Sequence, residues 1–378
     1  MYFLRYFAPK YALQACLYTV FGLFFLWNTA FTQYAASSQN SSSQNTAKSA
    51  FGQALRIKAV GDVLLGSYTP SRFIPPDSGN VFVTSIGAQL RGADICFGNF
   101  EAAFAIEGKM RAQKCSEASR RRGVCYEFGT PPFLAPSLKK LGFTVMSVDN
   151  NHADDYGADA AEFTKQTLRE QGIVPAPKRG HAEIMIAGKR VAIAAFGFSE
   201  TSHKISDVEN SARVVRELKK SYERVLVSFH GGAEGKNAMH TSDKTEIFVG
   251  ENRGNMIQFA HAVIDAGADM VIGHGPHVLR AVELYKNRFI AYSLGNFLTY
   301  GNINVKGVSG IACVLEASLD KASGEFLGGR IIPVVQRDPG IPELDPAQQA
   351  ITLIRELTSS DFPATPLVIE ADGTIRRK

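Results

Sequence analysis

Apolar β-rich runs and amphipathic helical segments alternate along this chain from about residue 55 onward. Strands are predicted at 56–66, 94–101, 143–148, 190–198, 223–230 and 268–274, and helices at 136–141, 161–171, 211–222 and 255–266. Toward the C-terminus, strands are predicted at 288–297, 311–317 and 330–335, followed by a helix that Asp345 caps and that extends to about Leu357. This order predicts an α/β fold whose central sheet is mostly parallel.

The composition fits a folded protein rather than a disordered one. The chain has 378 residues, of which 45% are hydrophobic and 20% are charged, enough to bury a sizeable core. The formal net charge of +5 is too small to indicate a nucleic-acid partner. The basic run at 120–122 is interpreted as a solvated loop.

The N-terminal segment indicates export across the cytoplasmic membrane. Two basic residues precede an apolar stretch at 17–31, which lies within a longer uncharged span. The apolar stretch suits a cleaved signal peptide, whereas the whole uncharged span is long enough for a signal anchor. Residues 1–36 are therefore predicted to be one or the other, with any cleavage near Ala35 or Ala36. Residues 37–54 form a Ser/Gln/Asn-rich linker with too little apolar surface to fold.

The five cysteines differ in their surroundings. Cys16 lies in the leader, and Cys96 and Cys313 lie in apolar runs that favour inert buried thiols. Cys115 and Cys125 bracket a basic insertion, and export would bring them into an oxidising compartment. We predict a local disulfide between these two residues.

Side chains that bind metals or transfer protons follow five of the predicted strands. They are Asp62, Asn99, Glu101, Asn150, Asn151, His152, His230, His274 and His277. Ligands of α/β sheets bind beyond the carboxyl ends of the strands, so we expect these side chains to meet in one crevice. Carboxylate, amide and imidazole groups together suit Mn²⁺, Zn²⁺ or Fe better than Ca²⁺ or a thiolate-bound zinc.

Each of these residues has a simpler explanation when taken alone. Asp62 follows a glycine as in many turns, Asn99 and Asn151 suit turns or caps, and a single His230 is more often a core or surface histidine. Their joint occurrence at successive strand ends favours a metal site. The other histidines lie in loops or helical patterns and are interpreted as structural, namely His181, His203, His240 and His261.

Six short strings contain most of these residues in a fixed order. They are GDVLLG at 61–66, NFE at 99–101, NNHADDYG at 150–157, HGGAE at 230–234, GADMVIGHGPHV at 267–278 and YSLGNF at 292–297. Together they resemble the bacterial poly-gamma-glutamate capsule biosynthesis (CapA-like) family, which shares the calcineurin-like metallophosphoesterase fold. The resemblance covers residues 55–335 of a domain at 55–378, leaving 336–378 as an extension. It implies a layered α/β/β/α sandwich with mixed, largely parallel sheets.

The resemblance also implies roles for individual residues. Two divalent ions would be held by six side chains: Asp62 and His277 for one ion, Asn151, His230 and His274 for the other, and Glu101 as the bridge. His152 would protonate a leaving group, with Asp155 as its catalytic partner. The remaining polar residues would orient these groups or contact substrate, namely Asn99, Asn150, Glu234 and Asn296.

The sequence departs from the wider phosphoesterase pattern at three places. Leu64 stands where a second histidine ligand is usual, Glu101 replaces a bridging aspartate, and the last motif is H-x-x-H instead of H-x-H. Insertions at 105–125 and 236–254 are also unusual for the capsule family. One metal would thus have fewer protein ligands, and access of substrate would differ.

The function expected from the resemblance is an exported, metal-dependent hydrolase that takes part in the synthesis of an envelope polymer of the poly-gamma-glutamate type. The bond broken would be a phosphoester or a gamma-glutamyl amide. The alternative is a non-catalytic accessory or polymer-binding subunit. Expected partners are the anionic polymer or its precursor and membrane-bound capsule synthesis proteins, with no nucleic acid. The expected location is periplasmic or otherwise extracytoplasmic.

Overall fold

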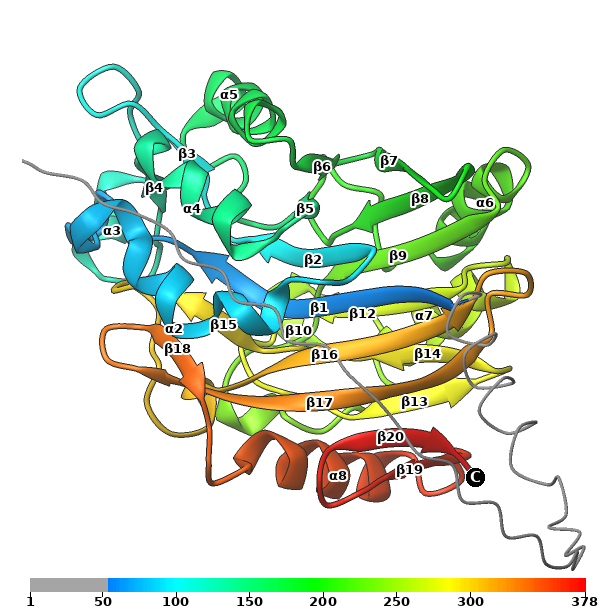
Figure 1. Cartoon of the computed structure of the whole chain (residues 1–378). Coiled ribbons are helices and arrows are strands. Elements are labelled where there is room, and N and C mark those ends of the chain that lie inside the picture. The colour runs from blue at the N-terminus through cyan, green and yellow to red at the C-terminus, as the bar shows by residue number, and fades with distance from the viewer. Residues whose placement is uncertain (1–53) are drawn as a thin grey trace, which may run out of the picture. The chain divides into compact units, whose positions relative to one another are not determined.

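The computed structural model describes residues 54–378. The predicted leader at 1–36 and almost all of the predicted linker lie outside these residues. Two large sheets run through the described part of the chain (Figure 1). Within residues 54–378, no helix is long and apolar enough to cross a membrane.

The first sheet has ten strands in the order β19-β20-β17-β16-β1-β2-β5-β6, with β15 paired to β1 and β18 paired to β17. Its parallel part consists of β1 (Ala54–Leu64), β2 (Ile95–Phe100), β5 (Val145–Val148), β6 (Val174–Pro177) and β15 (Asn296–Thr299). Its antiparallel part consists of β16 (Ile311–Asp320), β17 (Phe326–Arg337), β18 (Ile341–Leu344), β19 (Leu367–Ile369) and β20 (Thr374–Arg377). The segment that sequence analysis set apart as an extension therefore supplies three strands of this sheet.

The second sheet has six strands in the order β13-β14-β12-β9-β8-β7. They are β7 (His181–Ile186), β8 (Lys189–Phe196), β9 (Arg224–His230), β12 (Met270–His274), β13 (Val282–Tyr285) and β14 (Arg288–Ala291). The four inner strands are parallel and the two edge strands are antiparallel. The mixed character of both sheets is as predicted.

A hydrophobic core lies between the two sheets. It joins Ile57 and Phe97 of the first sheet to Ile193, Leu226 and Ile272 of the second, all of them buried. Burial of such side chains contributes about 1.5–3 kcal/mol each and fixes one sheet over the other. The carboxyl ends of the parallel strands in both sheets are thereby brought to the same edge of the stack.

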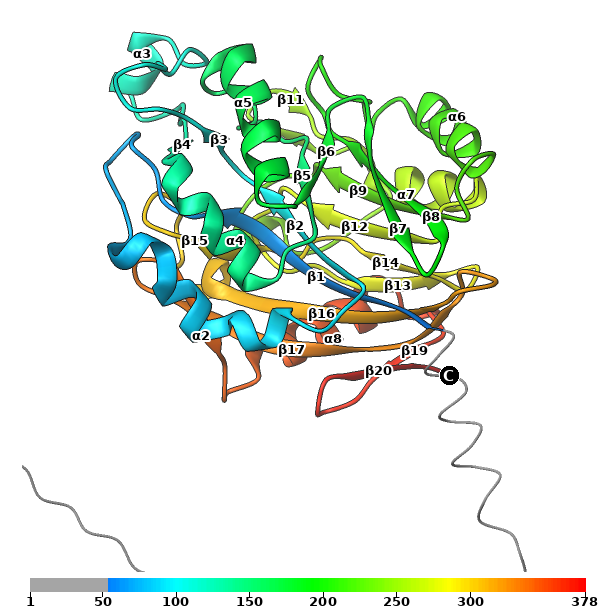
Figure 2. The same ribbon diagram turned by 45° about the horizontal axis from the view of Figure 1, so that its top comes forward.

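Helices cover the outer faces of the stack (Figures 1 and 2). Over the first sheet lie α2 (Asn80–Leu90) and α4 (Ala135–Leu141), and over the second lie α6 (Val208–Lys219) and α7 (Met256–Asp265). Two further helices, α5 (Gly157–Glu170) and α8 (Gln349–Asp361), pack at the margins against β6 and β17. The layered α/β/β/α sandwich that the resemblance implies is confirmed.

Two insertions leave this framework near the carboxyl ends of the strands. The first connects β3 (Ala103–Phe104) to β4 (Gly129–Thr130) and contains the short α3 (Glu117–Arg121). The second contains the hairpin of β10 (Ile247–Phe248) and β11 (Glu251–Asn252).

Two predicted elements differ from the structure. The single strand predicted at 288–297 is broken into β14 and β15, which belong to different sheets. Gly295 lies between them with a φ of +63°, a conformation that ends an extended run and that favours glycine. The last helix begins at Gln349 instead of directly after Asp345, although an oxygen of Asp345 still accepts the N–H of Gln349 at 2.9 Å.

Candidate metal centre

Three strands of the first sheet align their polar residues side by side. In the strand pairing, Asp62 of β1 lies opposite Asn99 of β2 and opposite Asn296 of β15. The register of β1 shifts between Ala59 and Asp62, and such bulges redirect side chains next to functional sites. Gly61 is required here because a Cβ at this position would lie 2.0 Å from the carbonyl oxygen of Gly295.

The second sheet aligns two histidines in the same way. His230 at the end of β9 lies opposite His274 at the end of β12. One donor atom from each of Asp62, Glu101 and His230 lies within 4.8 Å of the other two, and all three residues are buried. The strand ends therefore bring these three predicted ligands together, whereas His274 and His277 do not belong to the group of atoms within 4.8 Å.

In four of the six predicted ligand residues, a buried oxygen or nitrogen atom that could bind a metal has no hydrogen-bond partner. These atoms are Oε1 of Glu101, Oδ1 of Asn151, Nε2 of His230 and Nδ1 of His274. A buried polar atom without a partner costs about 1–3 kcal/mol, so four such atoms among the predicted ligands need an explanation. Divalent cations would bind atoms of this kind, and the set of carboxylate, amide and imidazole groups fits the metals predicted from sequence.

His274 is held with one nitrogen toward the site. Its Nε2 donates to the carbonyl oxygen of Val60 at 3.1 Å, which leaves the lone pair on Nδ1. Hydrogen bonding of the distal nitrogen to a backbone carbonyl is the usual way in which metal-binding histidines are oriented. The same contact ties β12 to β1 and hence links the two sheets.

Asp62, His277 and Asn296 form a second group of donors. Nδ1 of His277 lies 2.9 Å from Oδ2 of Asp62 and 3.0 Å from Oδ1 of Asn296. The orientation of the Asn296 amide is fixed because its Nδ2 donates to the carbonyl oxygens of His277 and Ser309, both at 3.2 Å. Oδ1 of Asn296 therefore faces Nδ1 of His277, which also contacts Asp62, and it could serve as a ligand there. Sequence analysis placed Asn296 near the site without this role.

The buried charges favour the protonation state that metal binding requires at His230, His274 and Asp62, and they oppose it at Glu101 and His277, which would each lose a proton on binding a metal. Burial lowers the pKa of His230 and of His274, so both imidazoles are neutral. Burial and then the charge of Asp62 raise the pKa of Glu101. For Asp62 itself, the hydrogen bond and charge of His277 outweigh burial and lower the pKa to about 2. The same pairing outweighs burial for His277 and raises its pKa to about 10.

Two asparagines connect these groups to the rest of the sheet. Nδ2 of Asn99 donates to Oδ1 of Asp62 at 2.9 Å and to Oε2 of Glu101, and it holds the two carboxylates at a fixed separation. Oδ1 of Asn99 accepts from Nδ2 of Asn150 at 2.9 Å, and Oδ1 of Asn150 accepts the N–H of His152 at 2.9 Å. Asn99 and Asn150 thus lie where residues that orient ligands are expected.

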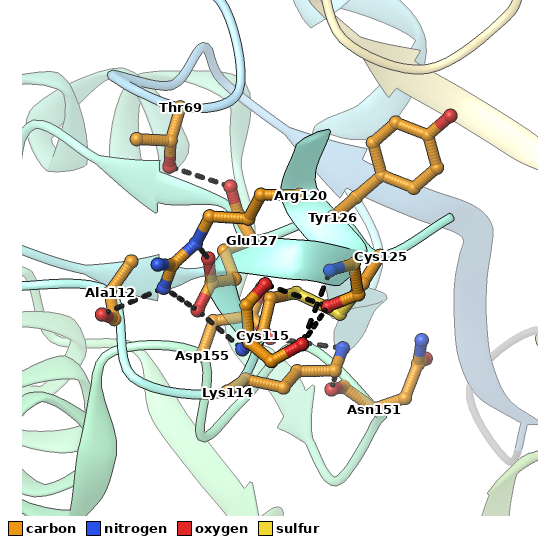
Figure 3. Close-up of a disulfide and its surroundings, with 12 residues drawn as sticks. Thr69, Ala112, Lys114, Cys115, Arg120, Cys125, Tyr126, Glu127, Asn151 and Asp155 are labelled. Atoms are coloured by element: carbon orange, nitrogen blue, oxygen red, sulfur yellow. Dashed lines mark hydrogen bonds and ion pairs between the residues drawn. A yellow bond between two sulfur atoms is a disulfide. The ribbon is translucent and has the colours of Figure 1, made fainter. Parts of the chain in front are cut away.

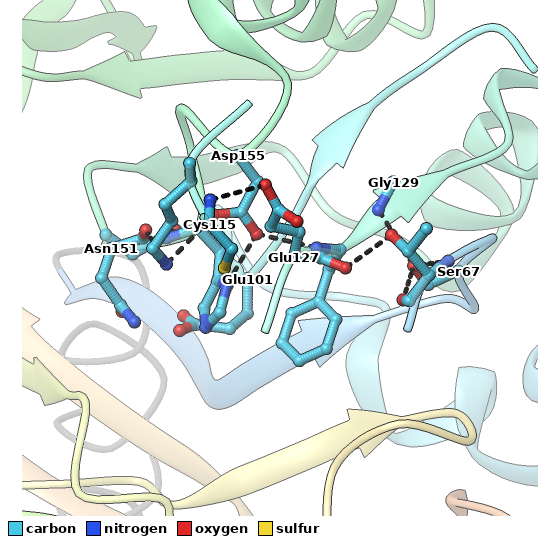
Figure 4. A network of polar contacts seen from close by, with 12 residues as sticks. Ser67, Glu101, Cys115, Glu127, Gly129, Asn151 and Asp155 are labelled. Carbon is cyan, nitrogen blue, oxygen red and sulfur yellow. Dashed lines mark hydrogen bonds and ion pairs between the residues drawn. The ribbon is translucent and has the colours of Figure 1, made fainter. Parts of the chain in front are cut away.

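His152 and Asp155 form a hydrogen-bonded pair in the loop between β5 and α5. Nδ1 of His152 lies 2.7 Å from Oδ2 of Asp155, which also accepts the N–H of Phe128 at 2.7 Å. Burial lowers the pKa of His152 despite the charge of Asp155. The pairing leaves Nε2 of His152 available for proton transfer. Figure 4 shows Asp155, Asn151 and Glu101 within this network of contacts.

Glu234 pairs with an arginine of the second insertion, since its Oε1 accepts from Nη1 of Arg253 at 2.9 Å. Its charge also contributes to the raised pKa of His277, and a role in orienting an imidazole stays a prediction. Arg253 belongs to the second insertion, as does Glu246, which forms a two-pronged ion pair with the fully buried Arg280. These anchors of the insertion had no signal in the sequence beyond the unusual length of the segment.

The first insertion supplies Lys114, which sequence analysis missed. Its Nζ lies 3.1 Å from Oδ1 of Asp155 and donates to the carbonyl oxygen of Asn151 at 2.8 Å. Lys114 precedes Cys115, which the structure joins to Cys125 by a disulfide (Figure 3). Its proximity to a cysteine was the only local clue to its position.

Comparison with known proteins identifies the family. The sequence model of the family described as "Bacterial capsule synthesis protein PGA_cap" matches residues 56–300, which is more than half of the chain. The chain belongs to this family.

Two relatives of the chain and one solved structure illustrate the range of likeness. A PGA biosynthesis protein CapA from Bacillus subtilis is 29% identical over 65% of this chain and 63% of its own length. A probable polyglutamine synthesis accessory protein from Mycobacterium tuberculosis is 25% identical over 64% of this chain and 66% of its own. A structure described as a novel phosphatase from Mycoplasma pneumoniae aligns with 13% identity and a TM-score of 0.44 over 80% of this chain and 99% of that one. The chain thus spans less than two thirds of the length of these relatives.

Proposed function

We propose that this chain is an exported hydrolase of envelope polymer synthesis that uses two divalent ions of manganese, zinc or iron. One observation carries the proposal. Buried donor atoms of Glu101, Asn151, His230 and His274 have no partner, and they come from the same strand ends as the paired His152. Such a donor set next to a histidine with a free nitrogen suits metal-assisted hydrolysis.

The side chains of the site have separate roles in the proposed reaction. Asp62, His277 and Asn296 would hold one ion and Asn151, His230 and His274 the other, with Glu101 between them. When bound, the ions supply Lewis acidity and lower the pKa of water. Asp155 fixes the ring of His152 through Nδ1, so that Nε2 exchanges a proton with the leaving group. Asn99 keeps the carboxylates of Asp62 and Glu101 apart.

The family suggests the kind of substrate. The Bacillus subtilis relative is named for PGA biosynthesis, so we propose that this chain acts on poly-gamma-glutamate or a precursor of it. The bond broken is a phosphoester or a gamma-glutamyl amide. Partners are the anionic polymer and membrane-bound synthesis proteins, and the basic and apolar leader at 1–36 supports a location outside the cytoplasmic membrane.

A non-catalytic accessory role is the second candidate. The Mycobacterium tuberculosis relative is named as a probable accessory protein of polyglutamine synthesis. Leu64 also stands where the wider phosphoesterase pattern has a histidine ligand, which weakens the site around Asp62. In this role the metal would stabilise a binding subunit without turnover.

Metal analysis combined with turnover separates the two candidates. The full-length protein is purified in detergent, its metals are measured by mass spectrometry, and phosphoester and gamma-glutamyl substrates are assayed. For a hydrolase, His152→Gln lowers kcat by about 10²-fold or more while the metal content stays the same. His274→Ala lowers the metal content as well.

The matched control is His240→Gln. His240 is exposed, pairs with Asp361 and makes no contact with a candidate ligand among the hydrogen bonds and ion pairs of the described residues, so we expect this variant to keep full activity. Full turnover by His152→Gln contradicts the role of His152 as the group that protonates the leaving group. Metal binding with no turnover on either substrate supports the accessory role instead.

A further inference from the structure

The insertion at 105–125 is attached at both ends next to the His152–Asp155 pair. Its flanking strands β3 and β4 run parallel, with the N–H of Ala103 bonded to the carbonyl oxygen of Phe128 at 3.1 Å and that of Ala105 bonded to Thr130 at 3.0 Å. Phe128 in turn donates its N–H to Asp155. Both ends of the insertion thus lie close to the proposed catalytic pair, because Phe128 links Ala103 to Asp155.

The disulfide fixes the middle of this insertion. Cys115 and Cys125 enclose α3, and their Cα atoms are 5.8 Å apart. The N–H of Cys115 donates to Oε1 of the buried Glu127 at 2.9 Å, and Glu127 also binds the guanidinium of Arg120. The backbone at Cys115 is therefore held by a covalent bond on one side and a buried carboxylate on the other (Figure 3).

The fixed backbone at Cys115 places the neighbouring Lys114 against Asp155. The ammonium group is 3.1 Å from Oδ1 of Asp155 and 2.8 Å from the carbonyl oxygen of Asn151, while the N–H of Gln113 donates to the carbonyl oxygen of Asp155 at 2.8 Å. Within residues 54–378, Asp155 makes ion pairs with Lys114 and His152 alone. Asp155 is fully buried, so its carboxylate needs both partners to keep its orientation.

We propose that the disulfide-closed insertion positions the His152–Asp155 pair, with Lys114 as the positioning residue. Lys114 forms an ion pair with Oδ1 of Asp155, which has no hydrogen bond of its own, while Oδ2 is bonded to His152 and Phe128. Without the ammonium group, the carboxylate keeps only its contacts through Oδ2, so that it is less firmly oriented and holds the tautomer of His152 less strictly. The role in turnover rests on the proposed hydrolase, whereas the effect on His152 does not.

Three variants test the role of Lys114 in the full-length protein. Lys114→Met keeps the length of the side chain and removes its charge, and Lys114→Arg keeps the charge. Lys109→Met is the matched control, because Lys109 is an exposed lysine of the same insertion. We expect Lys114→Met to lower kcat by about tenfold, the size typical for residues that orient a catalytic side chain. KM stays unchanged, Lys114→Arg recovers most of the loss, and Lys109→Met has no effect.

Reduction of the disulfide tests the same support without a substitution. Tris(carboxyethyl)phosphine breaks the S–S bond into two thiols, and the phosphine takes the oxygen of one water to become its oxide. Reduction of the folded wild-type protein should reproduce the effect of Lys114→Met. Reduction of Lys114→Met should then add little, because both changes act through one contact.

A spectroscopic measurement keeps the inference testable without turnover. In the zinc-loaded protein with ¹⁵N-labelled histidine, His152 is identified by the signal that His152→Gln removes. The wild type, Lys114→Arg and Lys109→Met should show the Nδ1-protonated tautomer, and Lys114→Met or reduction should give a mixture. If every protein lacks turnover, the hydrolase proposal fails and this spectrum alone decides the inference. An unchanged His152 spectrum in Lys114→Met and after reduction overturns it, whatever the effect on stability.

Discussion

Glu101 and Glu127 are two buried carboxylates that differ in their partners. Comparing the stability of Glu101→Met and Glu127→Met therefore distinguishes a proposed metal ligand from a carboxylate with a structural role. Oε1 of Glu101 has no partner, and Oε2 accepts from Asn99. Both oxygens of Glu127 are bonded, to the N–H of Cys115 and to Arg120. Methionine matches the length of glutamate in each case, so the comparison isolates the polar atoms.

The expected effects in the presence of a chelator have opposite signs. Glu101→Met removes an unpartnered buried oxygen, worth about 1–3 kcal/mol, and loses one hydrogen bond worth about 1 kcal/mol. We therefore expect the free energy of unfolding to rise by about 1 kcal/mol. Glu127→Met leaves the N–H of Cys115 without an acceptor, which costs about 1–3 kcal/mol. The exposed part of Arg120 makes its ion pair a minor contribution.

Added metal should reverse the order of stability. At a free metal concentration about 100 times Kd, a ligand that binds only the folded state stabilises it by about 2.7 kcal/mol. The wild type and Glu127→Met should both gain this amount, since Glu127 is not a ligand. Glu101→Met should gain much less, because it lacks the bridging carboxylate.

Urea unfolding followed by circular dichroism, with chelator and with Mn²⁺, measures all six free energies. Two results refute the reasoning. One is a Glu101→Met protein less stable than the wild type in chelator by more than about 1 kcal/mol, which would mean that the carboxylate has protein partners of its own. The other is an equal gain of stability with Mn²⁺ in Glu101→Met and the wild type.

Three further predictions concern other parts of the chain. Asn296→Ala removes a fixed ligand oxygen and should weaken metal binding about tenfold in isothermal titration calorimetry, without unfolding the protein. Glu246→Gln leaves a fully buried guanidinium without its counter-charge and should lower the free energy of unfolding in urea by about 3 kcal/mol. Deletion of 1–36 should keep the chain in the cytosol with Cys115 and Cys125 reduced, as detected by thiol alkylation and mass spectrometry.

Each of these predictions has a control and a contradicting result. Asn296→Asp keeps an oxygen at the same place and should bind metal, and unchanged affinity in Asn296→Ala removes Asn296 from the ligand set. Glu251→Gln alters an exposed partner of Arg253 and should change stability by less than about 0.5 kcal/mol, so equal losses in both glutamine variants contradict the burial argument. A disulfide that forms equally well without the leader argues against export as its cause.

The sequence was sufficient to predict that some of the polar residues at the strand ends meet, among them Asp62, Glu101 and His230. Parallel strands place their carboxyl ends at one edge, so Asp62, Asn99 and His230 could be assigned to the site without knowing the order of strands. Asp62 and His230 come together across two sheets for the same reason. The layered arrangement followed from the resemblance, and the helices that cover each face followed from their amphipathic spacing.

Contacts made by irregular segments could not be predicted in this way. Lys114 reaches Asp155 because a disulfide and Glu127 fix an insertion that has no periodic pattern of its own. The pairing of Glu234 with Arg253 depends on how the second insertion folds back over the strands. Local sequence also could not show that the run at 288–297 passes from one sheet to the other, because both halves have the same strand character.

Because the site draws on both sheets, its geometry depends on how they slide against each other. Asp62, Glu101 and Asn296 move with the first sheet, whereas His230 and His274 move with the second. If these side chains hold ions as proposed, a small shear between the layers would stretch the bonds to the ions from both sides. Substitutions in the apolar layer between the sheets would then change metal affinity from a distance, and a bound ion would resist the sliding of one sheet over the other.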